Sequence, residues 1–302
     1  MSTDRRSRIL QGIDIRRARG LEIGPLVWPL VRKDEGDITY VDHVTTEELR
    51  SKYARNKDVP ADLIVDVDAV WGAETLAEAV GGRRFDYILA SHVVEHVPDL
   101  IGWIGELLEV LEPDGEIRLA VPDRRYTFDY HRRETRLADV LAAHVVKARL
   151  PQPQQILEFH THFAALDAAA AWAGAVPTPP VISSQKRESW MDRAQKPLRG
   201  EYEDVHCWVF TPRSWALLMM DMDACGLLPC ECSLFHDTQP GAYEFTVGLR
   251  RGSGGWERMA HETQGKDSVE DRLRGEITAL RESTSWRITA PLRWVASVVR
   301  RR

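Results

Sequence analysis

Residues 85–99, Phe-Asp-Tyr-Ile-Leu-Ala-Ser-His-Val-Val-Glu-His-Val-Pro-Asp, join an apolar run to a polar cluster. Ile88 and Leu89 make the run apolar on both faces, which is typical of a strand buried in a parallel sheet. Asp99 then stands where a helix cap is expected, and apolar side chains recur at helical spacing as far as Leu111. Similar apolar runs lie at 20–24, 37–44, 61–70 and 116–123. Because these strands alternate with helices, the sequence predicts an α/β fold with a Rossmann-like, doubly wound and mostly parallel sheet.

Residues 20–250 form the predicted domain, and a basic arm at 1–19 precedes it. The regular alternation of strands and helices stops at the block 130–203, which contains helical and polar stretches. We therefore interpret this block as a helical and loop insertion. Within that block the polar stretch 185–201 is predicted to be a loop, and residues 204–212 after it are predicted to be a strand. Two strand-like runs close the domain and predict a terminal antiparallel hairpin.

The C-terminal residues are predicted to lie outside this domain. Residues 251–282 begin as a Gly- and Ser-rich linker and continue as a short coiled-coil helix. The narrow apolar stripe of that helix, which permits a homo-oligomer, consists of Val269, Leu273, Ile277 and Leu280. Residues 283–302 carry five arginines and no acidic residue, which predicts a basic amphipathic tail. Such a tail binds an anionic membrane surface or a partner protein.

Composition restricts the class of protein. The 302 residues are 43% hydrophobic and 28% charged, as in an ordinary globular protein. The net charge of −6 argues against nucleic acid as a partner, because phosphate neutralisation needs a basic surface. Four cysteines, no secretory signal and no apolar run of about 18 residues are found. We therefore expect a cytoplasmic protein that can lie at the inner face of the membrane through its C-terminal tail.

Acidic and glycine residues follow the predicted strands. Gly24 closes the first strand, where a glycine lets the backbone approach a ligand closely. Asp42 closes the second strand and can accept two hydrogen bonds from a ribose diol. Asp66 or Asp68 closes the third. This layout predicts a nucleoside-containing ligand across the carboxyl ends of the strands.

These residues together resemble class I S-adenosylmethionine-dependent methyltransferases. The resemblance rests on Glu22-Ile23-Gly24, on Asp42, on the stretch 85–98 and on the turn Leu111–Glu116, and it covers about residues 18–125. The predicted terminal hairpin also suits that fold. The resemblance implies S-adenosylmethionine as the cofactor and a methyl acceptor as the second substrate.

The resemblance also implies a role for each residue at the strand ends. The implied cofactor-binding residues are Glu22 at the methionine ammonium, Gly24 and Pro25 in the close-approach turn, Asp42 at the ribose, Asp68 and Ala69 at the adenine edge, and Ser91 and His92 beside the cofactor. Leu26 and Trp28 stand where the family usually has its second and third glycines.

His92, Glu95 and His96 form a second group of candidates. Their spacing puts them on one face if a helix begins by His92. Two imidazoles and a carboxylate can hold a divalent cation, and quinone-pathway O-methyltransferases, with Glu-x-x-Glu-His that binds a cation, resemble this stretch. The alternatives are a packed His96 that holds the helix start, and a general base at His92 or His96. Asp123, after the fifth strand, is the third candidate to orient or deprotonate an acceptor hydroxyl.

The acceptor is indicated only indirectly. Residues 283–293 resemble a tail of bacterial enzymes of surface-polysaccharide assembly, which predicts an O-methyltransferase for a sugar hydroxyl in polysaccharide or glycan biosynthesis. The insertion 130–203 would form its acceptor site. One alternative is a methyltransferase for another small molecule, such as a quinone or secondary metabolite. The other is a non-catalytic scaffold of a glycan-assembly complex, which the residues at the missing glycines favour.

Overall fold

The structure, a computed structural model, describes residues 3–265. The chain divides into two compact units, Met1–His261 and Glu262–Arg302, and the fold below is that of the first. The predicted coiled-coil stripe and the basic tail 283–302 lie outside the described residues. Within residues 3–265, no helix has the length and apolarity needed to cross a bilayer.

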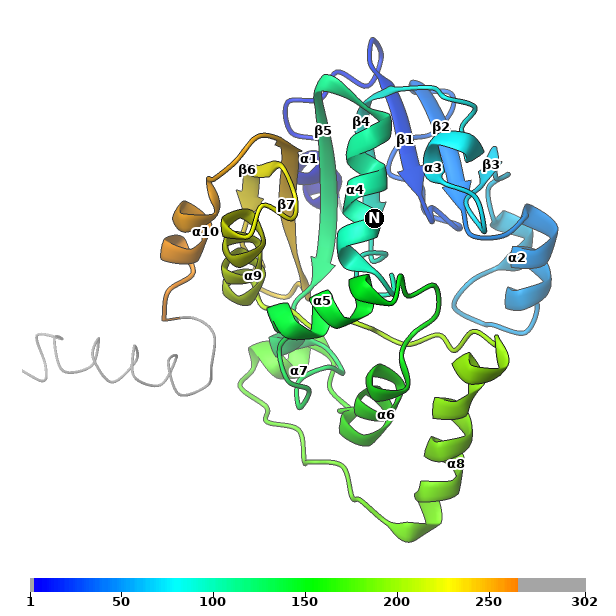
Figure 1. The fold of residues 1–302 in the computed structure, drawn as a ribbon, viewed down its shortest axis with the longest axis vertical. Helices are drawn as coiled ribbons and strands as arrows, with labels where there is room; N and C mark the ends of the chain where they lie inside the picture. Colours follow the sequence, from blue (N-terminus) through cyan, green and yellow to red (C-terminus); the bar gives the residue numbers. More distant parts are fainter. Residues whose placement is uncertain (1–2, 266–302) are drawn as a thin grey trace, which may run out of the picture. The chain divides into compact units, whose positions relative to one another are not determined.

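A seven-stranded sheet with the order β3-β2-β1-β4-β5-β7-β6 organises the first unit (Figure 1). The parallel strands are β1 (Arg19–Ile23), β2 (Asp37–Asp42), β3 (Ala69–Val70), β4 (Phe85–Ser91) and β5 (Leu111–Pro122). The antiparallel hairpin of β6 (Cys230–His236) and β7 (Glu244–Arg251) extends the sheet beyond β5. This topology confirms the predicted Rossmann-like sheet with a terminal hairpin.

Both faces of the central strands are buried. In β4, Ile88 and Ala90 belong to the larger core cluster, together with side chains of α4 (Leu100–Val110) and α9 (Pro212–Ala224). The alternate residues Tyr87 and Leu89 belong to a second cluster, which includes Ile9 of α1 (Thr3–Ile9). Because side chains alternate between the faces of a strand, the helices on both sides explain why this strand is apolar throughout.

The helices around the sheet begin and end at residues suited to those places. The Asp99 carboxylate accepts a hydrogen bond from the Gly102 N–H at 3.0 Å, so α4 begins where it was predicted. Gly226 has φ of 65° just after α9, as expected of a glycine stop. The other helices are α2 (Thr46–Tyr53), α3 (Leu76–Ala79), α5 (Leu137–Val145), α6 (Pro153–His162), α7 (Ala168–Trp172), α8 (Ser184–Gln195) and α10 (Trp256–Glu262). Helices α5 to α8 lie beyond the arrowhead of β5, at the carboxyl end of the sheet (Figure 1).

Two predicted strands were wrong. Residues 61–70 contain a 3-10 turn, Ala61–Leu63, and only the two residues of β3 pair with β2. Ile64 is nevertheless 2% exposed, so its apolar character reflects burial without strand pairing. Residues 204–212 form an extended segment in which Phe210 makes only an isolated bridge to Asp123.

Two polar segments are also more ordered than predicted. The stretch 185–201, predicted as a loop, is helix α8 followed by a 3-10 turn, Lys196–Arg199. Good helix formers fill it up to Pro197, so a polar helix is favoured there. The predicted linker after β7 instead turns back on β6. The Cys232 N–H donates to the Gly254 carbonyl at 3.0 Å, and Trp256 is 0% exposed.

Candidate functional site

The polar cluster after β4 lies in a turn, because helix α4 does not begin until Leu100. A common helix face for His92, Glu95 and His96 required a helix that begins by His92, and that condition is not met. His92 has φ of 56°, a left-handed conformation uncommon for a non-glycine residue, and it redirects the chain directly after the strand. The His96 N–H donates to the Val93 carbonyl at 2.9 Å, which closes the turn. His92, Glu95 and His96 thus come together through this turn and not along one helix face.

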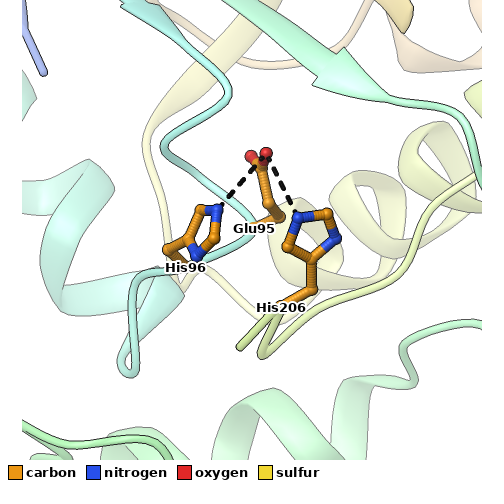
Figure 2. Close-up of side chains that lie close together, drawn as sticks. All are labelled: Glu95, His96 and His206. Carbon is orange, nitrogen blue, oxygen red and sulfur yellow. Dashed lines mark ion pairs between the residues drawn. The ribbon is translucent and has the colours of Figure 1, made fainter. Parts of the chain in front are cut away.

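Glu95 is the centre of the cluster. It is 1% exposed, and neither carboxylate oxygen has a hydrogen-bond partner among the described residues. Three imidazoles surround Oε1, with His92 Nδ1 at 3.5 Å and the Nε2 atoms of His96 and His206 at 3.9 Å each. Burial acts to raise the pKa of Glu95, but the imidazoles outweigh it and lower the pKa. Figure 2 shows the Glu95 carboxylate between the rings of His96 and His206.

His206 reaches this cluster from the extended segment after the insertion. The Cys207 and Trp208 N–H groups both donate to the Glu95 carbonyl, at 2.6 and 3.2 Å. The Trp208 indole N–H donates to the Val97 carbonyl at 2.6 Å. These bonds hold the segment against the turn after β4, and so they place His206 opposite Glu95. Sequence reasoning missed His206, although the closely spaced Asp204 and His206 mark the return from the polar insertion.

An outer carboxylate lies beside each of the two facing histidines. His206 Nδ1 lies 2.6 Å from Asp129 Oδ2, and His96 Nδ1 lies 3.1 Å from Asp204 Oδ1. Burial acts to raise the pKa of Asp129, but His206 and Arg132 lower it, while His96 holds the pKa of Asp204 well below its usual range. Ionised carboxylates only accept hydrogen bonds. Nδ1 of His206 therefore donates to Asp129, whereas the contact of His96 Nδ1 with Asp204 is an ion pair without hydrogen-bond geometry. Nε2 of each ring faces Glu95.

His92 is tied to the N-terminal arm and to β7. Its Nε2 lies 2.7 Å from Glu244 Oε2, and Arg5 binds both oxygens of Glu244 at 2.5 and 2.7 Å. Arg5 also donates to the Ser91 hydroxyl at 2.7 Å. Burial acts to lower the pKa of His92, but Glu244 and Glu95 outweigh it and raise the pKa to about 9. His92 is therefore an imidazolium near neutral pH. Sequence reasoning missed Arg5 and Glu244, because both lie far from residues 85–99 in the chain.

The Asp123 carboxylate makes its hydrogen bonds to residues outside this cluster. It is 0% exposed, and its carboxylate accepts hydrogen bonds from the Arg125 backbone and guanidinium and from the Thr238 hydroxyl at 2.7 Å. The structure does not bring Asp123 together with His92 or His96 through any of these contacts. Its carboxylate holds together the chain after β5 and the loop before β7.

Glu22 and Gly24 lie at the carboxyl end of β1. The Glu22 carboxylate is 2% exposed and accepts the Leu30 and Val31 N–H groups at 2.7 and 3.2 Å. Burial raises its pKa to about 7, against the lowering effect of those two bonds. Gly24 has φ of 64°, and its N–H already donates to the Val41 carbonyl. Gly24 therefore has no free N–H group to donate to a ligand, but without a Cβ it lets a ligand come close to the backbone. Pro25, which follows it, is buried.

Asp42 and Asp68 lie at the neighbouring strand ends. Asp42 Oδ1 accepts the His43 N–H at 2.7 Å and lies 2.5 Å from His43 Nδ1. Asp68 accepts the Tyr40 N–H at 2.8 Å and pairs with Lys33 at 2.5 Å, just before Ala69 enters β3. Because β2, β1 and β4 are adjacent in the sheet, their ends place Asp42, Glu22 and Ser91 along one edge.

Comparison with known proteins gives one informative match. A family model described as a methyltransferase domain matches residues 10–223. Among solved structures, one described as a Zn-dependent alcohol dehydrogenase from Rhodobacter sphaeroides is 15% identical, with 83% of this chain and 91% of that chain covered and a TM-score of 0.45. The CcbJ methyltransferase from Streptomyces caelestis is 13% identical, with 82% and 95% covered and a TM-score of 0.37.

The DhpI structure in complex with SAH is 14% identical, with 80% of each chain covered and a TM-score of 0.39. No curated protein sequence matched. The family model covers more than half of the chain and includes β1 to β5. The chain belongs to the methyltransferase domain family, and it is an S-adenosylmethionine-dependent methyltransferase.

Proposed function

We propose that this enzyme methylates a hydroxyl group of a sugar, during the synthesis of a bacterial surface polysaccharide or another glycan. The observation that carries the proposal is the cluster of Glu95, His96 and His206 beside the carboxyl end of β4. A sugar hydroxyl is a poor nucleophile until its proton is removed, and a group of imidazoles and a carboxylate is suited to assist that step.

The strand ends supply the proposed cofactor site. Glu22 would take the methionine ammonium, because it is the buried acid at the end of β1. Gly24 and Pro25 would form the close-approach turn, and Asp42 would bind the ribose hydroxyls. The proposed remaining contacts are Asp68 and Ala69 at the adenine edge, and Ser91 and His92 beside the cofactor. Asp68 already binds Tyr40 and Lys33, so its part in the adenine contact is the least directly supported.

Among the predicted catalytic residues, His96 fits an acceptor contact best. When bound, S-adenosylmethionine supplies a sulfonium methyl group for in-line transfer to the acceptor oxygen. His92 has a pKa of about 9 and is already protonated near neutral pH, so we assign it a positioning role. The Asp123 carboxylate is fully buried by Arg125 and Thr238. The side chain of His96 is 32% exposed, so it can reach a bound substrate.

The inserted helices supply the proposed acceptor site. A cavity of about 340 Å³ lies between α5, α6 and the residues after His206, Cys207 to Val209, and none of Glu95, His96 and His206 lines it. An acceptor bound there would have to extend beyond the cavity to reach the cluster. Its polar lining includes Arg133, Gln152, Gln155 and Glu158. Such groups can exchange hydrogen bonds with a polyhydroxylated acceptor, but the lining also includes the apolar side chains of Val146, Pro153 and Val209, so the cavity does not favour a sugar over a quinone.

The alternatives and the wider context remain proposals. Trp28 stands where the family usually has a glycine, but its side chain is 61% exposed and does not pack into the sheet. This exposure weakens the alternative of a non-catalytic scaffold. The contact with a membrane surface or glycan-assembly partner and the homo-oligomer depend on residues 251–302, most of which lie outside the described residues. The cytoplasmic location is proposed from the sequence alone.

An acceptor panel tests the proposal. The enzyme is incubated with methyl-labelled S-adenosylmethionine and separate pools of nucleotide sugars, lipid-linked oligosaccharides and quinols, and the product is located by NMR. We expect label on a sugar oxygen in one of the first two pools. Label on a quinol alone would support the small-molecule alternative, and cofactor binding without transfer to any pool would favour the scaffold.

A further inference from the structure

We propose that Glu95, His96 and His206 bind a divalent transition-metal ion, Zn²⁺ or a cation of similar preference, and that this ion binds the acceptor hydroxyl. The role in acceptor binding rests on the proposed function, whereas the metal site rests on the geometry alone. The cation expected from residues 92–96 is thereby given a different ligand set, in which His206 replaces His92.

The ligand atoms are already gathered. One ligand atom from each of Glu95, His96 and His206 lies within 4.8 Å of the others. Zinc bonds of about 2.0–2.2 Å place tetrahedral ligand atoms about 3.4 Å apart, so a small inward rotation of the side chains completes the site. Two imidazole nitrogens and one carboxylate oxygen suit Zn²⁺ and its neighbours better than Mg²⁺ or Ca²⁺, which prefer all-oxygen sites.

The buried Glu95 carboxylate, which has no hydrogen-bond partner among the described residues, points to a ligand beside it. Glu95 is 1% exposed and both oxygens lack hydrogen-bond partners within the described part of the chain. A buried charge without hydrogen bonds is costly. The His92 imidazolium balances part of this charge, but the three histidine nitrogens, at 3.5–3.9 Å, lie beyond normal hydrogen-bond distance. A cation between Glu95 and the two Nε2 atoms would give the carboxylate a direct bond.

The outer carboxylates complete the pattern. A metal-binding histidine usually gives its other ring N–H to a carboxylate, which fixes the tautomer and increases ligand basicity. Asp129 lies 2.6 Å from His206 Nδ1, and Asp204 lies 3.1 Å from His96 Nδ1. The Nε2 atom of each ring faces Glu95, at 3.9 Å from Oε1. His92 Nδ1 also lies near Glu95 Oε1, at 3.5 Å, but His92 does not belong to the group of ligand atoms that all lie within 4.8 Å of one another.

The site would act on the acceptor. Three protein ligands leave at least one coordination position for an acceptor oxygen, as in catalytic zinc sites. Coordination lowers the pKa of the bound hydroxyl, which gives its proton to solvent water. The resulting oxygen forms a bond to the methyl carbon as the carbon–sulfur bond breaks, and the sulfur keeps the electron pair of that bond.

Metal binding is measured first, without cofactor or acceptor. The full chain is stripped with a chelator, titrated calorimetrically with Zn²⁺, and then examined with Co²⁺, whose visible spectrum reports histidine ligation. We expect one equivalent of Zn²⁺ with submicromolar affinity and a tetrahedral-type Co²⁺ spectrum. Glu95→Gln and His206→Gln should each weaken Zn²⁺ binding at least 100-fold, and Asp129→Asn by about 10- to 100-fold.

His162→Gln is the matched control, because His162 is an exposed histidine of α6 and should bind the metal like the wild type. Circular dichroism and S-adenosylmethionine titration verify that each variant is folded. Substoichiometric Zn²⁺, or wild-type affinity in His206→Gln, would overturn the site. Stoichiometric metal binding that His206→Gln abolishes supports it, even if no sugar is methylated, so the metal site and the proposed function can fail separately.

Discussion

His206 Nε2 lies 3.9 Å from Glu95 Oε1, although the whole inserted block separates the two residues in the chain. The contact exists because the Cys207 and Trp208 N–H groups bind the Glu95 carbonyl. The end of the insertion is thus fixed to the turn after β4, where the acceptor and the cofactor would meet. Changes in the insertion are therefore expected to affect the cluster of Glu95, His96 and His206 directly.

Asp42→Ala should weaken S-adenosylmethionine binding by about 10- to 100-fold, because a carboxylate that binds two ribose hydroxyls contributes hydrogen bonds of about 1.5–3 kcal/mol. Calorimetric titration measures the affinity. Asp66→Ala is the control, since the Asp66 side chain is 81% exposed and pairs only with Arg50 among the contacts of the described residues. Equal affinity in the Asp42 variant and the control would remove Asp42 from the cofactor site.

Stability should fall with rising pH through the titration of Glu22. Its pKa is about 7 in the folded chain because of burial, against an ordinary value of 4.5, so folding favours the protonated form. The stability from this carboxyl is fully present below pH 4.5 and is lost as pH rises through 7. The loss is about 3 kcal/mol relative to Glu22→Gln, which cannot titrate. Urea unfolding of both proteins from pH 4.5 to 8 measures it, and parallel curves would contradict the assignment.

Asp123→Asn should act mainly on stability. The substitution leaves Arg125 without its buried counter-charge, which costs about 3–5 kcal/mol of unfolding free energy. Asp237→Asn, which alters a more exposed carboxylate 3.7 Å from the same guanidinium, should cost less. Thermal or urea unfolding compares the two. Wild-type stability with lost turnover in Asp123→Asn would instead make Asp123 a catalytic base.

Trp208→Phe should reduce methyl transfer while cofactor affinity stays unchanged. The variant loses the indole bond to the Val97 carbonyl, so the segment carrying His206 is held less firmly against Glu95. We expect a stability loss of about 1–3 kcal/mol and a lower kcat. Turnover and S-adenosylmethionine affinity are measured together. An unchanged kcat would show that this bond does not position His206 for the reaction.

The sheet was predictable from the sequence, because strands buried on both faces read as continuous apolar runs, as Ile88 and Leu89 do. Glu95 and His96 were found because they adjoin such a strand. The geometry of their cluster was not predictable, since it depends on a left-handed conformation at His92 that no glycine signals. His206 and Asp129 were missed because they reach the cluster only through long-range contacts formed by the inserted block.

The most direct measurement is the initial rate of methyl transfer from S-adenosylmethionine to the acceptor identified in the panel, for wild type, His206→Gln and His162→Gln, at saturating cofactor. The account predicts a loss of at least 100-fold in His206→Gln, a near wild-type rate in His162→Gln and unchanged cofactor affinity in both. Equal rates in the three proteins would contradict the claim that the cluster of Glu95, His96 and His206 carries the reaction.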